Sequence, residues 1–376
     1  MRADSFYDIL GADFYTGVPD SQLKALCDYL LERFGLDPKH HLIAANEGNA
    51  VGLAAGYHLA TGRVPVVYMQ NSGEGNAINP IASLLSDEVY GIPCIFVIGW
   101  RGEPGVHDEP QHIYQGKITC SLLELMDIDY LILGKDTTEE ELKDGISSFR
   151  ERINEGRSVA IVVRKGALEW QAKKEENAGS LPSREEIIEH IVRFTGDDPI
   201  VSTTGKASRE LFEIRKDRHE KDFLTVGSMG HASSIALGIA IQKPDKRVWV
   251  IDGDGAALMH MGAMAVIGDV KPSNLIHIVI NNGTHDTVGG QPHSMRDRNF
   301  AILSSGLGYT NSYRAEDIDK LDNILTEISD DMVDGPIFIE VMSATGARDD
   351  LGRPTTGAKE NKEAFMDFLS GDRRKV

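Results

Sequence analysis

The chain has 376 residues, which is enough for two ordinary domains that each bury a hydrophobic core. Its residues are 41% hydrophobic and 26% charged, as in soluble globular proteins, and its formal net charge of −19 argues against nucleic acid or an anionic membrane surface as a partner. No apolar run approaches the roughly 18 residues that cross a bilayer, and the N-terminus lacks the apolar core of a signal peptide, so we expect a cytoplasmic protein. Any small anionic substrate must be held by local cations, because the field of the whole molecule repels it.

Strand-like and helix-like segments alternate along the chain. The expected strands are 64–70, 93–99, 130–133, 158–164, 199–203, 247–252, 275–281 and 336–342. The expected helical segments include 47–61, 139–154, 185–195, 233–242 and 315–330. Near-continuous apolar strands separated by helices indicate parallel sheets that are covered on both faces, so the sequence predicts an α/β fold.

One polar stretch, 170–186, interrupts this alternation and contains Gly179 and Pro182, as inter-domain linkers do. We therefore expect a first domain at 1–172, a linker at 173–184 and a second domain at 185–376. The two halves also share a pattern, in which a helix of small residues and a strand lead to an acid between two glycines. These triplets are Gly73-Glu74-Gly75 and Gly253-Asp254-Gly255, and they predict two related doubly wound parallel-sheet domains.

The second triplet belongs to the most informative segment of the chain, residues 252–290. A strand ends at Gly253-Asp254-Gly255, a helix is expected next, and the following strand ends at Asn281-Asn282-Gly283-Thr284. Two strand ends joined by a crossover helix lie side by side at the carboxyl edge of a parallel sheet. A carboxylate (Asp254), an amide oxygen (Asn282) and a backbone carbonyl (Thr284) suit Mg²⁺, which also accepts phosphate oxygens and water.

The glycines of this segment let the backbone approach a diphosphate, and the helix N-terminus after Gly255 offers unpaired N–H groups. Either motif alone is most often an ordinary turn, but the two together, each closing a strong strand, favour a ligand site. Two other nucleotide motifs are excluded. The segment 203–208 lacks the first glycine of a phosphate-binding loop and has Ala207 after its lysine, and Leu258 replaces the third glycine of a dinucleotide fingerprint.

The paired motifs resemble the signature of thiamine-diphosphate-dependent enzymes, in which Gly-Asp-Gly is followed at similar spacing by Asn-Asn. The resemblance implies a thiamine-diphosphate-binding fold with Mg²⁺ held by Asp254, Asn282 and the Thr284 carbonyl. It further implies cofactor contacts from a set of residues that follow strands of the second domain: Thr204, Gly205, Met229, Gly253, Asp254, Gly255, Ala256, Asn282 and Thr284. Met229 stands where the family has a large apolar residue that holds the cofactor bent, although a core methionine would look the same.

Glu47, which precedes a helix rich in Ala and Gly, matches the family's glutamate that bonds the pyrimidine ring of the cofactor. An isolated glutamate at this point could equally favour the helix dipole alone. The resemblance therefore implies that Glu47 is both catalytic and cofactor-binding.

The absence of a middle domain and three motifs, at 102–112, 203–210 and 281–291, are similar to the compact phosphonopyruvate and sulfopyruvate decarboxylases. On this resemblance we expect decarboxylation of 3-phosphonopyruvate to phosphonoacetaldehyde and CO₂, in 2-aminoethylphosphonate biosynthesis. Sulfopyruvate is the alternative substrate, and a non-catalytic thiamine-diphosphate-binding regulator is an alternative of another class. A carboligase is disfavoured by the missing middle domain, and a magnesium phosphatase would leave Glu47 and Met229 unexplained.

Three histidines in expected loops, His107, His112 and His285, are candidate proton carriers, although loop histidines are more often solvated. The spacing of His107 and His112 makes a poor zinc site, and His277 is expected in the core. The candidate contacts for the substrate anion are the cations in or beside the motif loops: Arg101, Lys206, Arg296 and Arg298.

The resemblance also implies how chains associate, because in this family the cofactor lies between the first domain of one subunit and the second domain of another. We therefore expect a homodimer or an assembly of dimers with shared active sites. The expected partners are a small anionic 2-oxo acid and a second copy of the chain, with no nucleic acid and no membrane.

Overall fold

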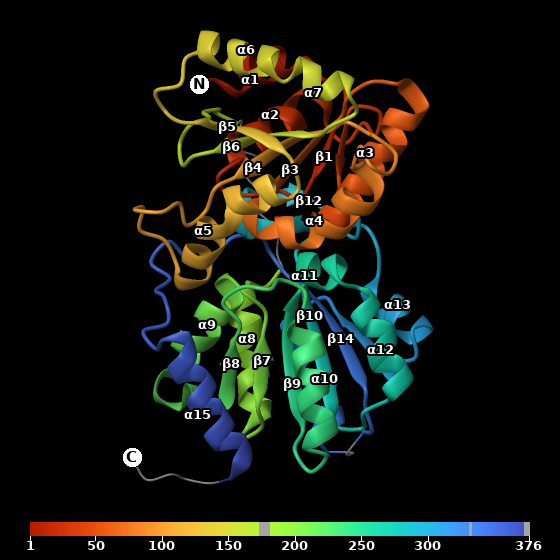
Figure 1. Ribbon diagram of the computed structural model, residues 1–376. Helices are drawn as coiled ribbons and strands as arrows, with labels where there is room; N and C mark the ends of the chain where they lie inside the picture. The colour runs from red at the N-terminus through yellow and green to blue at the C-terminus, as the bar shows by residue number, and fades with distance from the viewer. Residues whose placement is uncertain (173–180, 331–332, 372–376) are drawn as a thin grey trace. The chain divides into compact units, whose positions relative to one another are not determined.

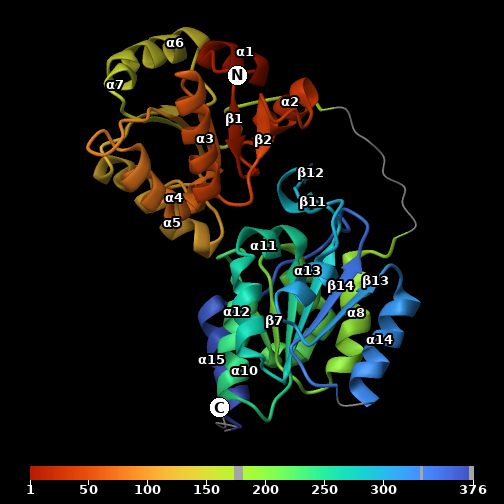
Figure 2. The same cartoon turned by 90° about the vertical axis from the view of Figure 1, so that its right-hand side faces the viewer.

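A computed structural model of the chain describes residues 1–172, 181–330 and 333–371, and Figures 1 and 2 show it from two sides. These residues divide into two units. Of the described residues, the first comprises 1–172 together with Thr287–Ser294, and the second comprises 181–286, 295–330 and 333–371. Most of the expected linker, 173–180, lies outside the described residues.

Each unit is built on one six-stranded sheet, and every strand pair within the two sheets is parallel. The strands of the first sheet are β1 (Tyr15–Gly17), β2 (His41–Ile43), β3 (Val66–Gln70), β4 (Ile95–Gly99), β5 (Asp129–Leu133) and β6 (Val159–Val163). The strands of the second are β7 (Ile200–Ser202), β8 (Asp222–Leu224), β9 (Val248–Gly253), β10 (Leu275–Asn281), β13 (Asn311–Ala315) and β14 (Ile337–Met342). Two short strands, β11 (Thr284–His285) and β12 (Gln291–Pro292), belong to neither.

The two sheets share one topology. The first runs β2-β1-β3-β4-β6-β5, and the second runs β13-β14-β10-β9-β7-β8. When the second sheet's strands are renumbered in chain order from β7, the same 2-1-3-4-6-5 arrangement results. The prediction of two related doubly wound domains is therefore confirmed, and the direction of winding reverses between strands one and three of each sheet, where such folds bind ligands.

Helices cover both faces of each sheet. In the first unit they are α1 (Ala3–Leu10), α2 (Lys24–Phe34), α3 (Glu47–Thr61), α4 (Glu74–Pro80), α5 (Pro110–Leu125), α6 (Glu139–Ser148) and α7 (Arg150–Asn154). In the second they are α8 (Arg184–Thr195), α9 (Lys206–Arg215), α10 (Ala232–Gln242), α11 (Asp254–Met259), α12 (Gly262–Val270), α13 (Phe300–Gly306), α14 (Ile318–Asp330) and α15 (Ala358–Ser370). Figure 2 shows α8 and α14 on one side of the second sheet and α10 and α12 on the other.

The double cover explains why the strands are apolar at nearly every position, since successive side chains point to opposite faces. In β3, Val66 and Tyr68 pack into a core formed with α1, α2 and α6. Their neighbours Val67 and Met69 pack into a second core, formed with α3, α4 and α5. All four side chains are at most 1% exposed.

The structure corrects several expectations about individual elements. The sequence reading missed the three-residue strands β1, β2 and β8 and the half-exposed strand β13, because none of them shows a long apolar run. The expected helix 139–154 is two helices, and Ala315, expected to begin a helix, ends β13. The crossover after Asp254 is also two helices, α11 and α12, rather than one.

In the part of the chain that the structure describes, no helix is both long enough and apolar enough to span a membrane. His277 is fully buried in β10, as expected, with Nδ1 2.9 Å from the Tyr309 hydroxyl. The three cysteines are free thiols, and Cys27 and Cys94 are buried.

Candidate active site

The register of the second sheet places Asp254 beside the end of β10. Gly253 at the end of β9 pairs with Ile280 of β10. The residues that follow this pair, Asp254 and Asn281, therefore lie side by side at the carboxyl edge of the sheet. Asp254 is 4% exposed, and its Oδ2 accepts the backbone N–H groups of Asn282, at 2.8 Å, and of Gly283, at 2.7 Å. Its Oδ1 accepts the Gly255 N–H at 2.7 Å. One carboxylate thus fixes the turn that follows β10.

The two neighbouring asparagines of this turn have different surroundings. Asn281 is fully buried, and its amide donates to Glu340 of β14 at 2.7 Å. Asn282 lies at the partly exposed edge, where its Oδ1 accepts the N–H and the hydroxyl of Thr284, at 3.0 and 3.1 Å. Asn281 therefore supports the strand, and Asn282 carries the oxygen that is available to a ligand.

The donor set at this edge fits Mg²⁺. Among the described residues, no three His, Cys, Asp or Glu side chains gather as a metal site, so a metal here needs a mixed set of oxygens. Asp254, Asn282 and the Thr284 carbonyl supply a carboxylate, an amide and a backbone oxygen within one hydrogen-bonded turn. Hard oxygen donors of this kind, completed by phosphate oxygens and water, suit magnesium.

Gly255 lies where Met229 and His285 converge. A Cβ atom at Gly255 would lie 3.0 Å from Nδ1 of His285 and 3.4 Å from Cε of Met229, so a larger residue would crowd both side chains. Met229 precedes α10, in a loop with Ser228 and Gly230 at positive φ. Two residues expected to contact the cofactor and one candidate proton carrier are therefore brought together in the second unit.

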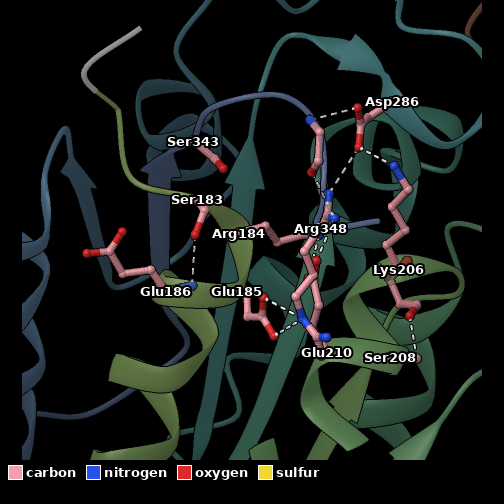
Figure 3. A network of polar contacts seen from close by, with 12 residues as sticks. Ser183, Arg184, Glu185, Glu186, Lys206, Ser208, Glu210, Asp286, Ser343 and Arg348 are labelled. Atoms are coloured by element: carbon pink, nitrogen blue, oxygen red, sulfur yellow. Dashed lines mark hydrogen bonds and ion pairs between the residues drawn. The ribbon is translucent and has the colours of Figure 1, made fainter. Parts of the chain in front are cut away.

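The loop after β7 contains Thr204 and Gly205, two of the residues expected to contact the cofactor. Gly205 has φ of 93° and precedes α9, whose N-terminus receives no side-chain cap. Uncapped first-turn N–H groups bind phosphate oxygens well. Lys206, however, is not a free cation, because its Nζ lies 3.2 Å from Oδ2 of Asp286 (Figure 3).

In the first unit, Glu47 begins α3 and is 5% exposed. Its Oε2 accepts the side-chain N–H of Asn76 at 2.8 Å. Its carboxylate also packs against Gly73, where a Cβ atom would lie 2.5 Å from Oε1. The Gly73-Glu74-Gly75 turn is thus shaped around Glu47, which explains why a glycine is required at position 73.

An ion pair at the start of the motif loop 102–112 holds this loop in place. Arg101 binds Asp108 through two hydrogen bonds, of 2.7 and 2.5 Å, and Asp108 also accepts the N–H groups of Gly102 and Glu109. Burial alone would raise the pKa of Asp108, but the Arg101 guanidinium and these bonds lower it below its usual value. The positive charge of Arg101 is therefore already balanced by the Asp108 carboxylate.

The two histidines of this loop differ. His107 is exposed in the loop, whereas His112 lies in the first turn of α5. Burial, with a contribution from Arg101, lowers the pKa of His112 to about 4, so its ring is neutral near pH 7. His285 is buried in the short strand β11. The expectation that all three histidines lie in loops is therefore correct only for His107.

Two buried acids of the first unit escaped the sequence analysis as candidates. Asp20, after β1, is fully buried, accepts the N–H groups of Gln22 and Leu23, and has its pKa raised to about 6 by burial. Glu74, noted only as part of a repeated triplet, is 2% exposed, and neither carboxylate oxygen accepts a hydrogen bond of ordinary geometry within the described residues. Burial raises the pKa of Glu74 to about 8, and the nearby Thr119 hydroxyl only partly offsets this effect.

Comparison with known proteins relates both units to one group of enzymes. The model for the thiamine pyrophosphate enzyme N-terminal TPP binding domain matches residues 4–123, and the model for the C-terminal TPP binding domain matches residues 202–341. Phosphonopyruvate decarboxylases from Streptomyces viridochromogenes and Streptomyces hygroscopicus are each 32% identical to this chain. The alignments cover 96% of this chain and 92% and 91% of those enzymes. A sulfopyruvate decarboxylase from Methanosarcina acetivorans is 30% identical over 80% of both chains.

The burial of Glu74 predicts a measurable pH dependence of stability. Its folded-state pKa of about 8 exceeds the ordinary value of 4.5, so between these pH values folding takes up a proton, and stability falls as pH rises. One proton contributes at most about 1.4 kcal/mol per pH unit. We expect Glu74→Gln to lose less stability than the wild type between pH 5.5 and 8, as measured by denaturant unfolding. Burial also raises the pKa of Asp20 to about 6 and that of Asp222 to about 7, but both groups titrate in both proteins and cancel in this comparison. Parallel pH profiles would therefore contradict the prediction.

Proposed function

The chain belongs to the thiamine pyrophosphate enzyme family, and from this premise we propose that it decarboxylates 3-phosphonopyruvate to phosphonoacetaldehyde and carbon dioxide. The extent of the match to phosphonopyruvate decarboxylases carries the choice of substrate, because those alignments cover 96% of the chain. The Methanosarcina acetivorans sulfopyruvate decarboxylase aligns over 80% of this chain and 80% of its own length. The presence of both domains in one chain therefore does not distinguish the two activities. Sulfopyruvate is therefore the second candidate substrate.

The second-unit residues proposed to hold the cofactor follow four strands of the second sheet, β7, β8, β9 and β10. Asp254, Asn282 and the Thr284 carbonyl would hold Mg²⁺, and the N–H groups after Gly205 and Gly253 would face the diphosphate. The fixed turn around Asp254 supports this assignment, because the donor oxygens need little rearrangement to bind a metal. Met229, beside Gly255, would contact the body of the cofactor.

Glu47 is proposed to hold the proton that activates the cofactor. Its carboxylate is buried and oriented by Asn76, and a rotating, solvated glutamate would relay a proton less efficiently. When bound, thiamine diphosphate supplies the sink for the electrons that remain after carbon dioxide leaves. The chain's own residues supply the orientation and the proton transfers.

A proton must also reach the substrate carbon before the aldehyde is released, and the histidines differ in their fitness for this role. His112 is neutral near pH 7, so it can accept a proton but must gain one before it can donate. His285 lies against Gly255, beside the residues proposed to hold the cofactor. We therefore assign the proton-carrying role to His285 first, with His112 and His107 as the other candidates.

The phosphonate group needs cations that are not already paired. Arg101 is bound to Asp108, Lys206 to Asp286, and Arg296 lies 2.9 Å from Asp297. Arg298 is exposed and forms no ion pair with the carboxylates of the described residues. Pairing thus favours Arg298 over the other three, since a paired cation must be released before it binds the substrate.

The substrate assignment is tested by turnover of phosphonopyruvate, sulfopyruvate and pyruvate side by side, with thiamine diphosphate and Mg²⁺ supplied. We expect kcat/KM for phosphonopyruvate to exceed that for pyruvate by about 100-fold or more, because a site built for a charged group rejects an analogue that lacks it. A preference for sulfopyruvate would replace the proposed substrate. The absence of carbon dioxide release from all three would contradict decarboxylation and favour a non-catalytic binding protein.

The active site is further proposed to be shared between two subunits, with Glu47 from one and Asp254 from the other. Glu47→Gln should lower turnover by about 100-fold, as for other positioned acid–base groups, and Asp254→Ala should be inactive for lack of bound cofactor. Mixing the two inactive chains should restore activity. Random exchange gives half mixed dimers with one intact site each, hence about a quarter of wild-type activity.

Each variant subjected alone to the same exchange protocol is the control for this mixing experiment, and tagged chains verify that mixed dimers form. Verified mixed dimers that stay inactive would contradict the shared site. A monomer that is active at nanomolar dilution would exclude it.

A further inference from the structure

An ion cluster of the second unit includes residues that adjoin two of the proposed cofactor loops (Figure 3). Asp286 is at its centre and is 12% exposed. Its Oδ2 accepts Lys206 at 3.2 Å and Arg184 at 3.3 Å, and its Oδ1 accepts the N–H of Gly346 at 3.0 Å. Arg184 also binds Glu210 through two hydrogen bonds, of 2.7 and 2.8 Å. The cluster therefore joins two cations to two carboxylates, and their charges balance.

The cluster gathers four segments that are distant in the sequence. Asp286 directly follows β11, and Lys206 is the first residue of α9, immediately after Gly205. Arg184 begins α8, and Gly346 follows β14, with φ of 99° and its carbonyl accepting from Arg184 at 3.3 Å. Two of these segments, the loop before α9 and the loop after β10, are the ones proposed to hold the diphosphate and the metal.

We propose that Asp286 is a positioning residue that fastens the Thr284–Asp286 loop to the Gly205–Lys206 loop, and that Lys206 serves this cluster rather than the substrate anion. The inference rests on the proposed function, which gives the two loops their role. Asp286 lies two residues after the Thr284 carbonyl and one after His285, so a displaced Asp286 carries both with it. Partners that orient metal ligands in this way commonly change metal affinity by about 10-fold to 100-fold.

The burial of the cluster explains why it holds the loops firmly. Arg184 and Glu210 have side chains that are 9% and 2% exposed, so their charges are poorly solvated and depend on one another and on Asp286. Arg184 fixes α9 through Glu210, and Asp286 fixes the same helix through Lys206. Helix α9 is thus held at two points, and both connect it to Asp286, directly through Lys206 and indirectly through Glu210 and Arg184.

A neighbouring ion cluster provides a matched control. Arg348 binds Glu185 at 3.0 Å and Asp350 at 3.0 Å, and it also pairs with Glu213. These residues are more exposed, and none belongs to either cofactor loop. Glu185→Gln therefore removes an ion pair of the same chemistry without touching the proposed fastening.

The test is a double-mutant cycle of Asp286→Asn and Lys206→Met, with affinity for thiamine diphosphate measured calorimetrically at saturating Mg²⁺ and fixed ionic strength. Asp286→Asn keeps an acceptor for the Gly346 N–H and removes only the charge. We expect each single variant to weaken cofactor binding by about 10-fold or more. The double variant should bind no more weakly than Asp286→Asn, because the Lys206–Asp286 ion pair that Lys206→Met removes is already lost in that variant. Glu185→Gln should bind as the wild type does.

Equal cofactor affinity in Asp286→Asn and the wild type, or additive losses in the double variant, would overturn the inference. So would a Lys206→Met variant that raises KM for phosphonopyruvate and leaves cofactor affinity unchanged, since Lys206 would then hold the substrate. If Asp286→Asn does not fold, Lys206→Met alone decides between these outcomes. A wild type that binds no thiamine diphosphate would instead overturn the proposed function together with the inference.

Discussion

The bond between the Asp254 carboxylate and the backbone N–H groups after β10 is the interaction on which the candidate site depends. Hydrogen bonds to a charged group contribute about 1.5–3 kcal/mol each, and a buried carboxylate without them would be strongly disfavoured. Because Asp254 accepts from Asn282 and Gly283, the turn between β10 and β11 takes one shape. The Asn282 amide, the Thr284 carbonyl and the His285 ring are all placed by that turn.

The two domains show how one scaffold supports two kinds of chemistry. Both sheets have the same strand order, yet the acids Asp20, Glu47 and Glu74 follow strands of the first, and the oxygen donors Asp254 and Asn282 follow strands of the second. Glu47 is oriented by Asn76 and a glycine turn, and Asp254 is oriented by backbone N–H groups. Function in such folds is set by the side chains after each strand rather than by the sheet.

Much of this arrangement can be predicted from the sequence, and the reasons for the rest are physical. Strands such as β10 are recognisable because both faces are buried, so most of their residues are apolar. Strands β1 and β2 have three residues each, and β13 is half-exposed, so no such pattern exists in them. The helix that begins at Glu47 was also predictable, because Asn46 caps it and small residues follow.

Pairings between side chains that are remote in the sequence cannot be predicted from local sequence patterns. Nothing local to Lys206 or Asp286 indicates that they meet, since 80 residues separate them. The burial of Glu74 likewise depends on α5, which is remote in the sequence, and the division of labour between Asn281 and Asn282 depends on Glu340 of β14. Tertiary contacts decide which polar residues are structural and which face a ligand.

The most direct test of the account is thiamine diphosphate binding by Asp254→Ala, measured calorimetrically with and without Mg²⁺ and accompanied by circular dichroism. The account predicts that the wild type binds the cofactor tightly only with Mg²⁺. The variant should keep its secondary structure and lose the magnesium-dependent part of the affinity. A folded variant with the same magnesium-dependent affinity as the wild type would contradict the assignment of Asp254, and with it the site built around that residue.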